Sequence, residues 1–156
     1  MKQIVLTLAY SFLFFNCFAQ NTELSKQVNP FIGTGGHGHT FPGATVPFGM
    51  VQLSPDTRVD GSWDGCSGYH YSDSIIYGFS HTHLSGTGCS DYGDIAFMPS
   101  LTTGKLMENI AEVENLSQSF RHANEVSKAG YYSVLLDNGV KVELTSTIRT
   151  GLQQYT

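Results

Sequence analysis

The segment from residue 30 to residue 49, PFIGTGGHGHTFPGATVPFG, restricts the fold more than any other part of the chain. It carries three prolines and six glycines in twenty residues. Proline lacks a backbone N–H and glycine weakens helices and strands, so no regular helix or central strand fits here. We expect a long ordered loop with short extended pieces, and a loop of this length inside a compact domain is usually functional.

The clearest local signal further along the chain is a β-hairpin. Residues 131–136 and 140–148 are rich in β-formers and flank the sequence Asp-Asn-Gly at 137–139. An Asn-Gly pair tolerates the positive φ of a tight hairpin turn. In the second arm, Val140, Val142 and Leu144 alternate with polar residues, which is typical of a half-buried strand.

Other segments extend this β pattern. Shorter strand-like runs cover residues 50–53, 75–79 and 94–98, and a second glycine-rich loop covers residues 61–68. A helix over residues 108–116 is the one other element that the sequence suggests. We therefore predict an all-β fold, an antiparallel β-sandwich with long glycine-rich loops at one end.

The first nineteen residues have the organisation of a secretory signal peptide. Lys2 supplies a positive start, residues 4–15 form an apolar run, and Cys17 and Ala19 place small residues before a cut after Ala19. The run is short for a bilayer span, and the bulky residues before Cys17 fit a lipoprotein site poorly. We expect residues 20–156 to be exported to the periplasm, the cell surface or the medium, with no membrane attachment after cleavage.

The composition excludes several classes of protein. Eight Lys and Arg against thirteen Asp and Glu give a net charge of −5, which disfavours nucleic-acid binding because phosphates require a surplus of cations. A chain with 12% aromatic and only 13% charged residues is not disordered. After signal cleavage Cys66 and Cys89 remain, too few for a disulfide scaffold, and whether they pair is left open.

The histidines are the first candidates for chemistry. His37 and His39 form one His-x-His pair, His81 and His83 form another, and His70 lies between them. Imidazoles are common metal ligands. However, no carboxylate follows either pair within a few residues, as a protein metal site of this type requires. We expect no metal site in this chain, and histidines that bond loop backbone and line a polar cleft.

The single tryptophan, Trp63, lies in a Gly-Ser-Trp-Asp-Gly loop rather than in an apolar run. An exposed indole can stack on the apolar face of a pyranose while nearby polar groups bond its hydroxyls. Asp64, Tyr69 and His70 follow within eight residues. The residues alone leave a sugar site and a purely structural loop as equal alternatives.

Five segments, in this order, resemble glycoside hydrolase family 92. They are residues 28–57 (VNPFIGTGGHGHTFPGATVPFGMVQLSPDT), 63–71 (WDGCSGYHY), 77–94 (YGFSHTHLSGTGCSDYGD), 129–136 (AGYYSVLL) and 143–149 (ELTSTIR). Members of that family are secreted, calcium-dependent, inverting exo-α-mannosidases. They consist of an N-terminal β-sandwich followed by a larger (α/α)6 barrel, with the active site between the two.

The resemblance implies that residues 20–156 are the family's N-terminal sandwich domain, and we expect this domain to be incomplete, truncated at Thr156 and without the catalytic barrel. The family's proton-donating glutamate, its aspartate base pair and most calcium ligands lie on the barrel, so we expect no catalytic residue here and no cofactor for this chain alone. Its implied partners are α-mannoside glycans, such as N-glycans or mannans, and its own barrel domain.

The expected mannose contacts follow from the matched motifs. Trp63 would be the stacking platform, and the residues around the same cleft would be Asp64, Cys66, Tyr69, His70, His81 and His83. Two other functions remain open: a stand-alone carbohydrate-binding module without catalysis, and an exported β-domain without a ligand. The coding sequence beyond codon 156 would distinguish them from the enzyme.

Overall fold

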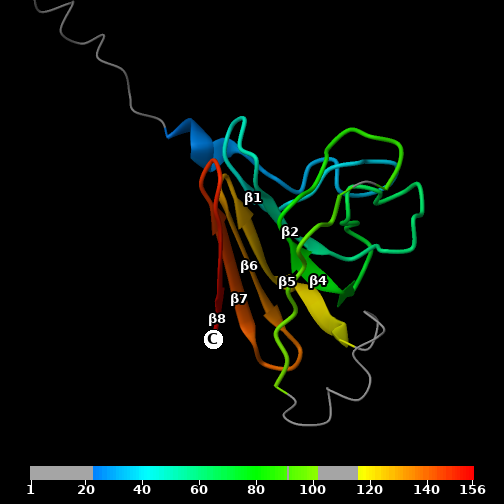
Figure 1. Cartoon of the computed structure of the whole chain (residues 1–156), viewed down its shortest axis with the longest axis vertical. Helices are drawn as coiled ribbons and strands as arrows, with labels where there is room; N and C mark the ends of the chain where they lie inside the picture. Colours follow the sequence, from blue (N-terminus) through cyan, green and yellow to red (C-terminus); the bar gives the residue numbers. More distant parts are fainter. Residues whose placement is uncertain (1–22, 91, 102–115) are drawn as a thin grey trace, which may run out of the picture.

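The computed structural model describes residues 23–90, 92–101 and 116–156 (Figure 1). The elements are the 3-10 helix η1 (Leu24–Gln27) and the strands β1 (Ala44–Thr45), β2 (Gln52–Asp56), β3 (Ile75–Ile76), β4 (Gly78–Ser80), β5 (Gln118–Lys128), β6 (Tyr131–Leu136), β7 (Lys141–Ser146) and β8 (Gly151–Tyr155). The signal peptide expected over residues 1–19, and all but the last residue of the helix expected over 108–116, lie outside the described residues.

The described strands form two antiparallel sheets, which confirms the predicted fold class. The smaller sheet has the order β1-β2-β4 and the larger one the order β3-β5-β6-β7-β8. Strands β1 and β2 contact β7, and β1 also contacts β6, so the small sheet covers part of one face of the large sheet (Figure 1). Long loops connect the strands of the small sheet and carry the residues of interest for function.

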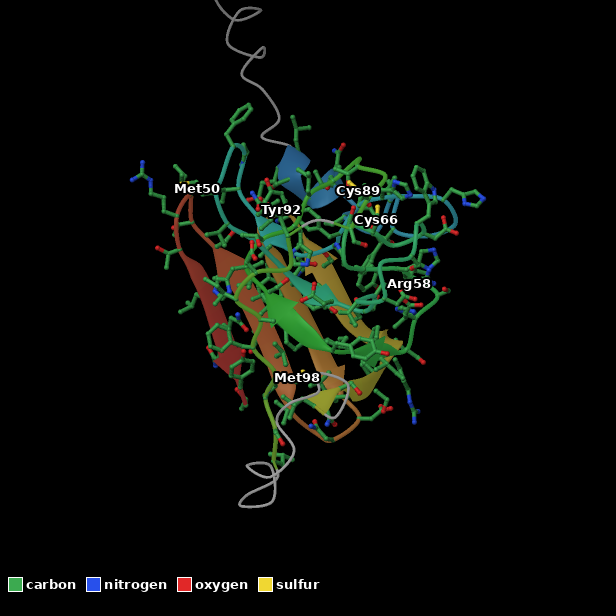
Figure 2. The ribbon with its side chains drawn as sticks, turned by 45° about the vertical axis from the view of Figure 1, so that its right-hand side comes forward. Met50, Arg58, Cys66, Cys89, Tyr92 and Met98 are labelled. Carbon is green, nitrogen blue, oxygen red and sulfur yellow. The ribbon has the colours of Figure 1, made fainter. Side chains whose placement is uncertain are left out.

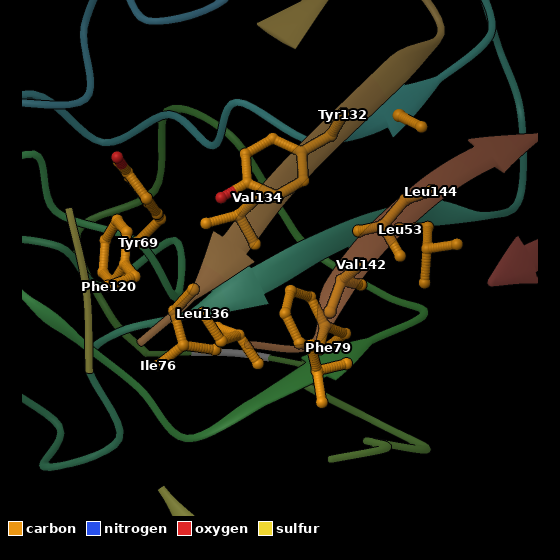
Figure 3. Packing of buried hydrophobic residues seen from close by; sticks show 12 residues of the cluster. Leu53, Tyr69, Ile76, Phe79, Phe120, Tyr132, Val134, Leu136, Val142 and Leu144 are labelled. Atoms are coloured by element: carbon orange, nitrogen blue, oxygen red, sulfur yellow. The ribbon is translucent and has the colours of Figure 1, made fainter. Parts of the chain in front are cut away.

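The core lies between the two sheets. Tyr132, Val134 and Leu136 on β6, with Val142 and Leu144 on β7, are 0–1% exposed. They pack toward Leu53 on β2 and Phe79 on β4 (Figure 3). The intervening residues of β7 are exposed or half-buried, so the alternation predicted for the second arm of the hairpin is confirmed.

The predicted hairpin turn is also present. The Val140 N–H donates to the Asn138 side-chain oxygen (3.0 Å), and Gly139 has a φ of 92°, which favours glycine. Strands β6 and β7 pair from Tyr131 opposite Thr145 to Leu135 opposite Lys141. Local turn chemistry therefore determines this part of the sheet.

Three other predicted strands have different bounds. The run at 50–53 begins later and continues through Pro55 to Asp56. The run at 75–79 splits, because the Tyr77 N–H donates to the Asp56 carbonyl (2.8 Å) at the point where β3 and β4 join different sheets. The run at 94–98 forms only one bridge, between Phe97 and Phe79.

The glycine-rich loop of residues 30–49 is tied to strands formed by the end of the chain. Ser127 donates its hydroxyl to the Pro42 carbonyl, and Ser146 donates to the Ala44 carbonyl (3.1 Å). The Met50 N–H donates to the Ile148 carbonyl (2.7 Å), which joins the β1–β2 turn to the β7–β8 turn. These contacts hold an irregular segment in place without a long strand of its own.

Within the described ranges, no helix has the length and apolar character needed to cross a membrane.

Candidate functional site

A cavity of about 450 Å³ opens where the end of β2 and strand β4 meet the loops of residues 57–68 and 83–96. Its lining includes Asp56, Arg58, Cys66, Ser67, His83 and Tyr92; of these, Arg58, Cys66 and Tyr92 are labelled in Figure 2. The Thr57 N–H donates to the Gly68 carbonyl (2.7 Å), which closes the first loop into a compact unit. The cavity is large enough for a small polar ligand.

Asp56 and His83, which line the cavity, form a buried polar cluster with Ser80. The His83 Nδ1–H donates to the Gln52 carbonyl (2.7 Å), and His83 Nε2 lies 2.9 Å from Asp56 Oδ1. The Ser80 hydroxyl donates to the same carboxylate oxygen (3.0 Å). Serine and aspartate meet the same imidazole nitrogen, so this cluster lacks the relay geometry of a Ser-His-Asp triad. It joins β2 to β4 and to the following loop.

A thiol, that of Cys66, and a hydroxyl, that of Ser67, belong to residues that also line the cavity. The Cys66 thiol is buried and donates to the Thr87 carbonyl (3.3 Å), and both Cys66 and the exposed Cys89 are free thiols. The Ser67 hydroxyl is buried and has no hydrogen-bond partner among the described residues. A buried hydroxyl without a partner is costly, so a polar ligand or water in the cavity would gain by bonding it.

The loop of Trp63 lies beside the cavity, because the Cys66 N–H donates to the Trp63 carbonyl (3.3 Å). The indole is 60% exposed, as expected for a stacking platform, and one edge meets the His39 ring at a centroid distance of 4.9 Å. Gly88 lies behind it: a Cβ there would come within 2.4 Å of the indole. The exposed ring is therefore backed by two neighbours that set its position.

Charged groups fix the same loop. His37 Nδ1 lies 2.9 Å from Asp64 Oδ1, and this hydrogen bond lowers the pKa of the Asp64 carboxyl. The Arg58 guanidinium donates to the Asp64 carbonyl (2.8 Å) and, with two nitrogens, to the Asp73 carboxylate (3.0 and 3.1 Å). The hydrogen bond with Asp73 raises the pKa of Arg58. Asp64 is thus an ionised acceptor at neutral pH, suited to bonding a hydroxyl and unsuited to donating a proton.

The structure distributes the seven expected contact residues over three places. Trp63 and Asp64 lie on the exposed loop, and Cys66 and His83 line the cavity. Tyr69, His70 and His81 neither line the cavity nor lie on that exposed loop.

Tyr69 and His70 are engaged in the structure of the domain. Tyr69 is fully buried in the core. The His70 Nε2–H donates to the Gly36 carbonyl (3.0 Å), while its Nδ1 accepts the Ser72 N–H (3.2 Å). Nε2 of His70 therefore joins this segment to the glycine-rich loop of residues 30–49, while Nδ1 holds the local turn at Ser72.

His81 does not line the cavity that His83 lines. Its Nδ1–H donates to the Ile95 carbonyl (2.9 Å), and its ring packs edge-on against Phe97 at 5.7 Å. Residues two apart on a strand point to the same side, but β4 ends at Ser80, so both histidines lie beyond the strand and their side chains diverge. The second His-x-His pair is therefore split between two environments.

The described residues contain no group of three or more His, Cys, Asp or Glu side chains that could hold a metal ion. Calcium takes six to eight oxygen ligands, several of them carboxylates. The described part of this chain does not fit such an ion.

The polar cluster around Glu125 could not be predicted from the sequence. The Glu125 carboxylate on β5 is completely buried and accepts the hydroxyls of Tyr69 (3.0 Å) and Tyr132 (2.7 Å). It also accepts the Nδ1–H of His122 (2.8 Å), whose ring stacks on Tyr71 at 4.2 Å. This cluster connects the large sheet to the loop that follows Trp63.

Burial, followed by the charge and hydrogen bond of Glu125, raises the pKa of both Tyr69 and Tyr132. The unfolded chain ionises these tyrosines near pH 10, whereas the folded chain keeps them protonated. The stability they contribute is therefore complete below pH 10 and is lost as the pH rises above it. We expect the unfolding free energy to fall above pH 10, and to fall less steeply in Tyr132→Phe, as measured by urea unfolding with tyrosinate absorbance in parallel. An equal slope in both proteins would contradict this.

Comparisons with known proteins agree on one family. The sequence model of the glycosyl hydrolase family 92 N-terminal domain matches residues 27–156. A family 92 α-mannosidase from Bacteroides thetaiotaomicron, solved with mannoimidazole, is 42% identical with a TM-score of 0.76, covering 85% of this chain and 18% of that one.

Two further relatives are more distant. An inverting family 92 mannosidase from Bacteroides thetaiotaomicron is 30% identical with a TM-score of 0.71, covering 88% of this chain and 18% of that one. An uncharacterised secreted glycosidase from Arthroderma benhamiae is 30% identical over 140 residues, covering 85% of this chain and 17% of the relative. This chain thus spans less than a fifth of the length of these relatives.

Proposed function

Because this chain belongs to glycoside hydrolase family 92, as its N-terminal domain, we propose that it contacts the terminal mannose of α-mannoside glycans in an inverting exo-α-mannosidase. The glycans would be N-glycans or mannans. In this proposal the chain is the first part of a longer exported enzyme whose helical barrel carries the acid and the base. The solved relatives are α-mannosidases, one of them inverting, and the fungal relative is described as secreted.

The observation that carries the proposal is the exposed Trp63 indole beside an ionised Asp64 and a polar cavity. The face of a pyranose ring stacks on an indole, and its hydroxyls require acceptors and donors at the rim. Asp64 supplies an acceptor at this rim. The chain thereby offers the groups that hold and orient a sugar.

In this proposal calcium is bound by the longer enzyme and not by this chain alone. Its ligands would come from the barrel, because the described residues of this chain do not form a site for it. There the ion would polarise sugar oxygens. The role of this chain would be to position the sugar and to exclude water on one side of it.

We expect the 156-residue chain alone to hydrolyse no α-mannoside. Inverting hydrolysis needs a protonated carboxyl and a carboxylate about 6.5–9.5 Å apart. In this chain Asp64 is ionised by His37, and Asp94 accepts the Thr82 hydroxyl (3.2 Å) within its own loop. Turnover of an aryl α-mannoside by the purified chain, at a rate above that of an unrelated protein prepared identically, would refute this expectation.

The proposal is tested by Trp63→Ala in the full-length enzyme. Loss of the stacking platform should reduce transition-state binding by roughly 1–3 kcal/mol, seen as a lower kcat/KM. The melting temperature should change little, since a 60% exposed ring contributes less to stability than a core residue.

A second variant, Gly88→Ala, retains the indole but displaces it, because the new Cβ would lie 2.4 Å from the ring. It should also lower kcat/KM. The matched control is Leu84→Ala, which removes a partly exposed side chain from the loop that also carries Gly88. If Trp63→Ala lowered the melting temperature strongly while activity per folded molecule stayed constant, Trp63 would be structural and the proposal would fail.

A further inference from the structure

The two cysteines of residues 20–156, Cys66 and Cys89, lie on loops at the same end of the molecule (Figure 2). Both are free thiols, and Cys66 is buried whereas Cys89 is exposed. The Cys66 thiol donates to the Thr87 carbonyl (3.3 Å) and lies 3.9 Å from the Thr87 hydroxyl. That hydroxyl donates to the Cys89 carbonyl (3.1 Å). Thr87 therefore contacts the side chain of one cysteine and the backbone of the other.

The cavity connects the two loops a second time. Cys66 and Ser90, the residue after Cys89, both belong to its lining. The Cys66 side chain is therefore buried without being enclosed by the core, and it borders open space that the loop of Cys89 also borders. Two thiols on opposite loops of one cavity are placed to meet if one loop moves by about the length of a residue.

The loop of residues 84–90 is the one that can move. All of its residues except Thr87 are exposed, and exposed segments change conformation at a small cost in free energy. The Gly86 N–H donates to the His39 carbonyl (2.7 Å), which anchors the loop before the cysteine. A disulfide requires the two Cα atoms to lie about 4.4–6.8 Å apart. A shift of Cys89 toward Cys66 meets this requirement without unfolding the core.

We propose that Cys66 and Cys89 are a redox modification site, at which an external disulfide oxidises the two thiols to an intramolecular disulfide. This rests on the proposed function, since export takes the chain into a compartment where such oxidants are present. The exposed Cys89 thiolate attacks the external disulfide, forms a mixed disulfide and releases one thiolate. The Cys66 thiolate then attacks the Cys89 sulfur and releases the second. The protein loses two electrons and two protons, and the external disulfide gains both and leaves as two thiols.

The bond would act on the stacking platform of the proposed sugar site. Gly88, directly before Cys89, lies so close to the Trp63 indole that a Cβ there would come within 2.4 Å of the ring. On the other loop, the Cys66 N–H donates to the Trp63 carbonyl (3.3 Å). A disulfide between Cys66 and Cys89 would therefore join the turn that carries the indole to the residue behind it, and would restrict the movement of both.

A metal ion held by the two thiolates is the competing use of these residues. Zinc bound through cysteine takes four protein ligands in a structural site and three in a catalytic one. The described residues offer no group of three His, Cys, Asp or Glu side chains in which the two thiols could take part. The local chemistry therefore favours a bond between the sulfurs.

The test follows both thiols in the folded full-length protein by mass spectrometry. Reduced protein is incubated with oxidised glutathione, alkylated with iodoacetamide in denaturant and digested with trypsin. No Lys or Arg lies between Arg58 and Lys105, so residues 59–105 leave as one peptide that carries both cysteines. We expect this peptide to be two hydrogens lighter and to take up no iodoacetamide. Further cleavage with chymotrypsin, for example after Phe79, should give fragments that separate only after reduction.

Two variants test the order of the steps. Cys66→Ser should stop at a mixed disulfide between Cys89 and glutathione, because the second thiol is missing. Cys89→Ser changes an exposed residue, so it should fold normally, and its buried Cys66 should take up iodoacetamide and no glutathione. In the oxidised wild-type protein, the amides of residues 84–90 should exchange hydrogen more slowly than in the reduced protein.

Alkylation of both cysteines at every glutathione concentration would overturn the proposal, as would a wild-type protein that stops at the mixed disulfide. A bond from either cysteine to another peptide, or a disulfide-linked dimer, would overturn it too, and so would equal exchange in the two forms. If Cys66→Ser does not fold, the wild-type protein and Cys89→Ser still decide the question. These readouts do not use activity, so they remain informative if Trp63→Ala leaves catalysis intact.

Discussion

Replacing Glu125 by alanine is expected to lower the free energy of unfolding by about 4 kcal/mol. The substitution removes the carboxylate that accepts two buried tyrosine hydroxyls, from Tyr69 and Tyr132, and leaves both without a partner in the core. Each unsatisfied buried donor costs about 1–3 kcal/mol. Urea unfolding followed by near-UV circular dichroism measures the loss, and the same variant should uncouple the loop after Trp63 from the large sheet.

Glu125→Gln is the matched control for this prediction. Its side-chain oxygen still accepts hydrogen bonds from both tyrosines, while the amide cannot accept the His122 N–H through its nitrogen. We expect the glutamine variant to lose less than half of what the alanine variant loses. Equal losses would show that the charge on Glu125, rather than the satisfaction of the two hydroxyls, stabilises the core.

Gly43→Ala is expected to cost about 3–5 kcal/mol, although it adds only one methyl group. A Cβ at residue 43 would lie 2.2 Å from the Leu53 carbonyl oxygen and 2.5 Å from the Ser54 Cα. Both atoms belong to the backbone of β2, which is fixed by β1 on one side and β4 on the other. The clash can only be relieved by moving the glycine-rich loop off the sheet.

Gly35→Ala in the same loop provides the comparison. The nearest atom to its new Cβ is the Tyr71 Cβ at 3.6 Å, an ordinary contact. Its melting temperature should stay within a few degrees of the parent, whereas that of Gly43→Ala should fall clearly. Similar behaviour of the two variants would mean that backbone freedom, rather than close approach, explains the glycines of this loop.

The parts of the fold that the sequence predicts well are those determined by neighbouring residues. The hairpin of β6 and β7 follows from the Asn-Gly turn and from one alternating arm. Strand β8 had no such signal: the sequence GLQQY at residues 151–155 is extended because it pairs with β7. Strand β5 escaped prediction because its pairing with β6 is irregular between Phe120 and Glu125, which breaks the alternation.

The candidate site was harder to predict, for a related reason. Trp63 could be placed on the surface because glycines and polar residues surround it in the sequence. Tyr69 has similar neighbours, yet its loop folds back over the sheets and its hydroxyl bonds Glu125, a residue 56 positions away. Sequence spacing cannot reveal such a partner. Likewise, the separation of His81 from His83 depends on where the chain leaves β4.

The ties between the first loop and the last strands also determine when the domain can fold. Ser146 bonds Ala44 across 102 positions, and Ser127 bonds Pro42 across 85. Contacts over such separations carry a large loop-closure entropy and make folding slow. As the chain is synthesised from its N-terminus, the glycine-rich loop lacks its hydrogen bonds to Ser127 and Ser146 until β5 and β7 have been made. A chain that remains unfolded for this long is open to proteases during the same interval.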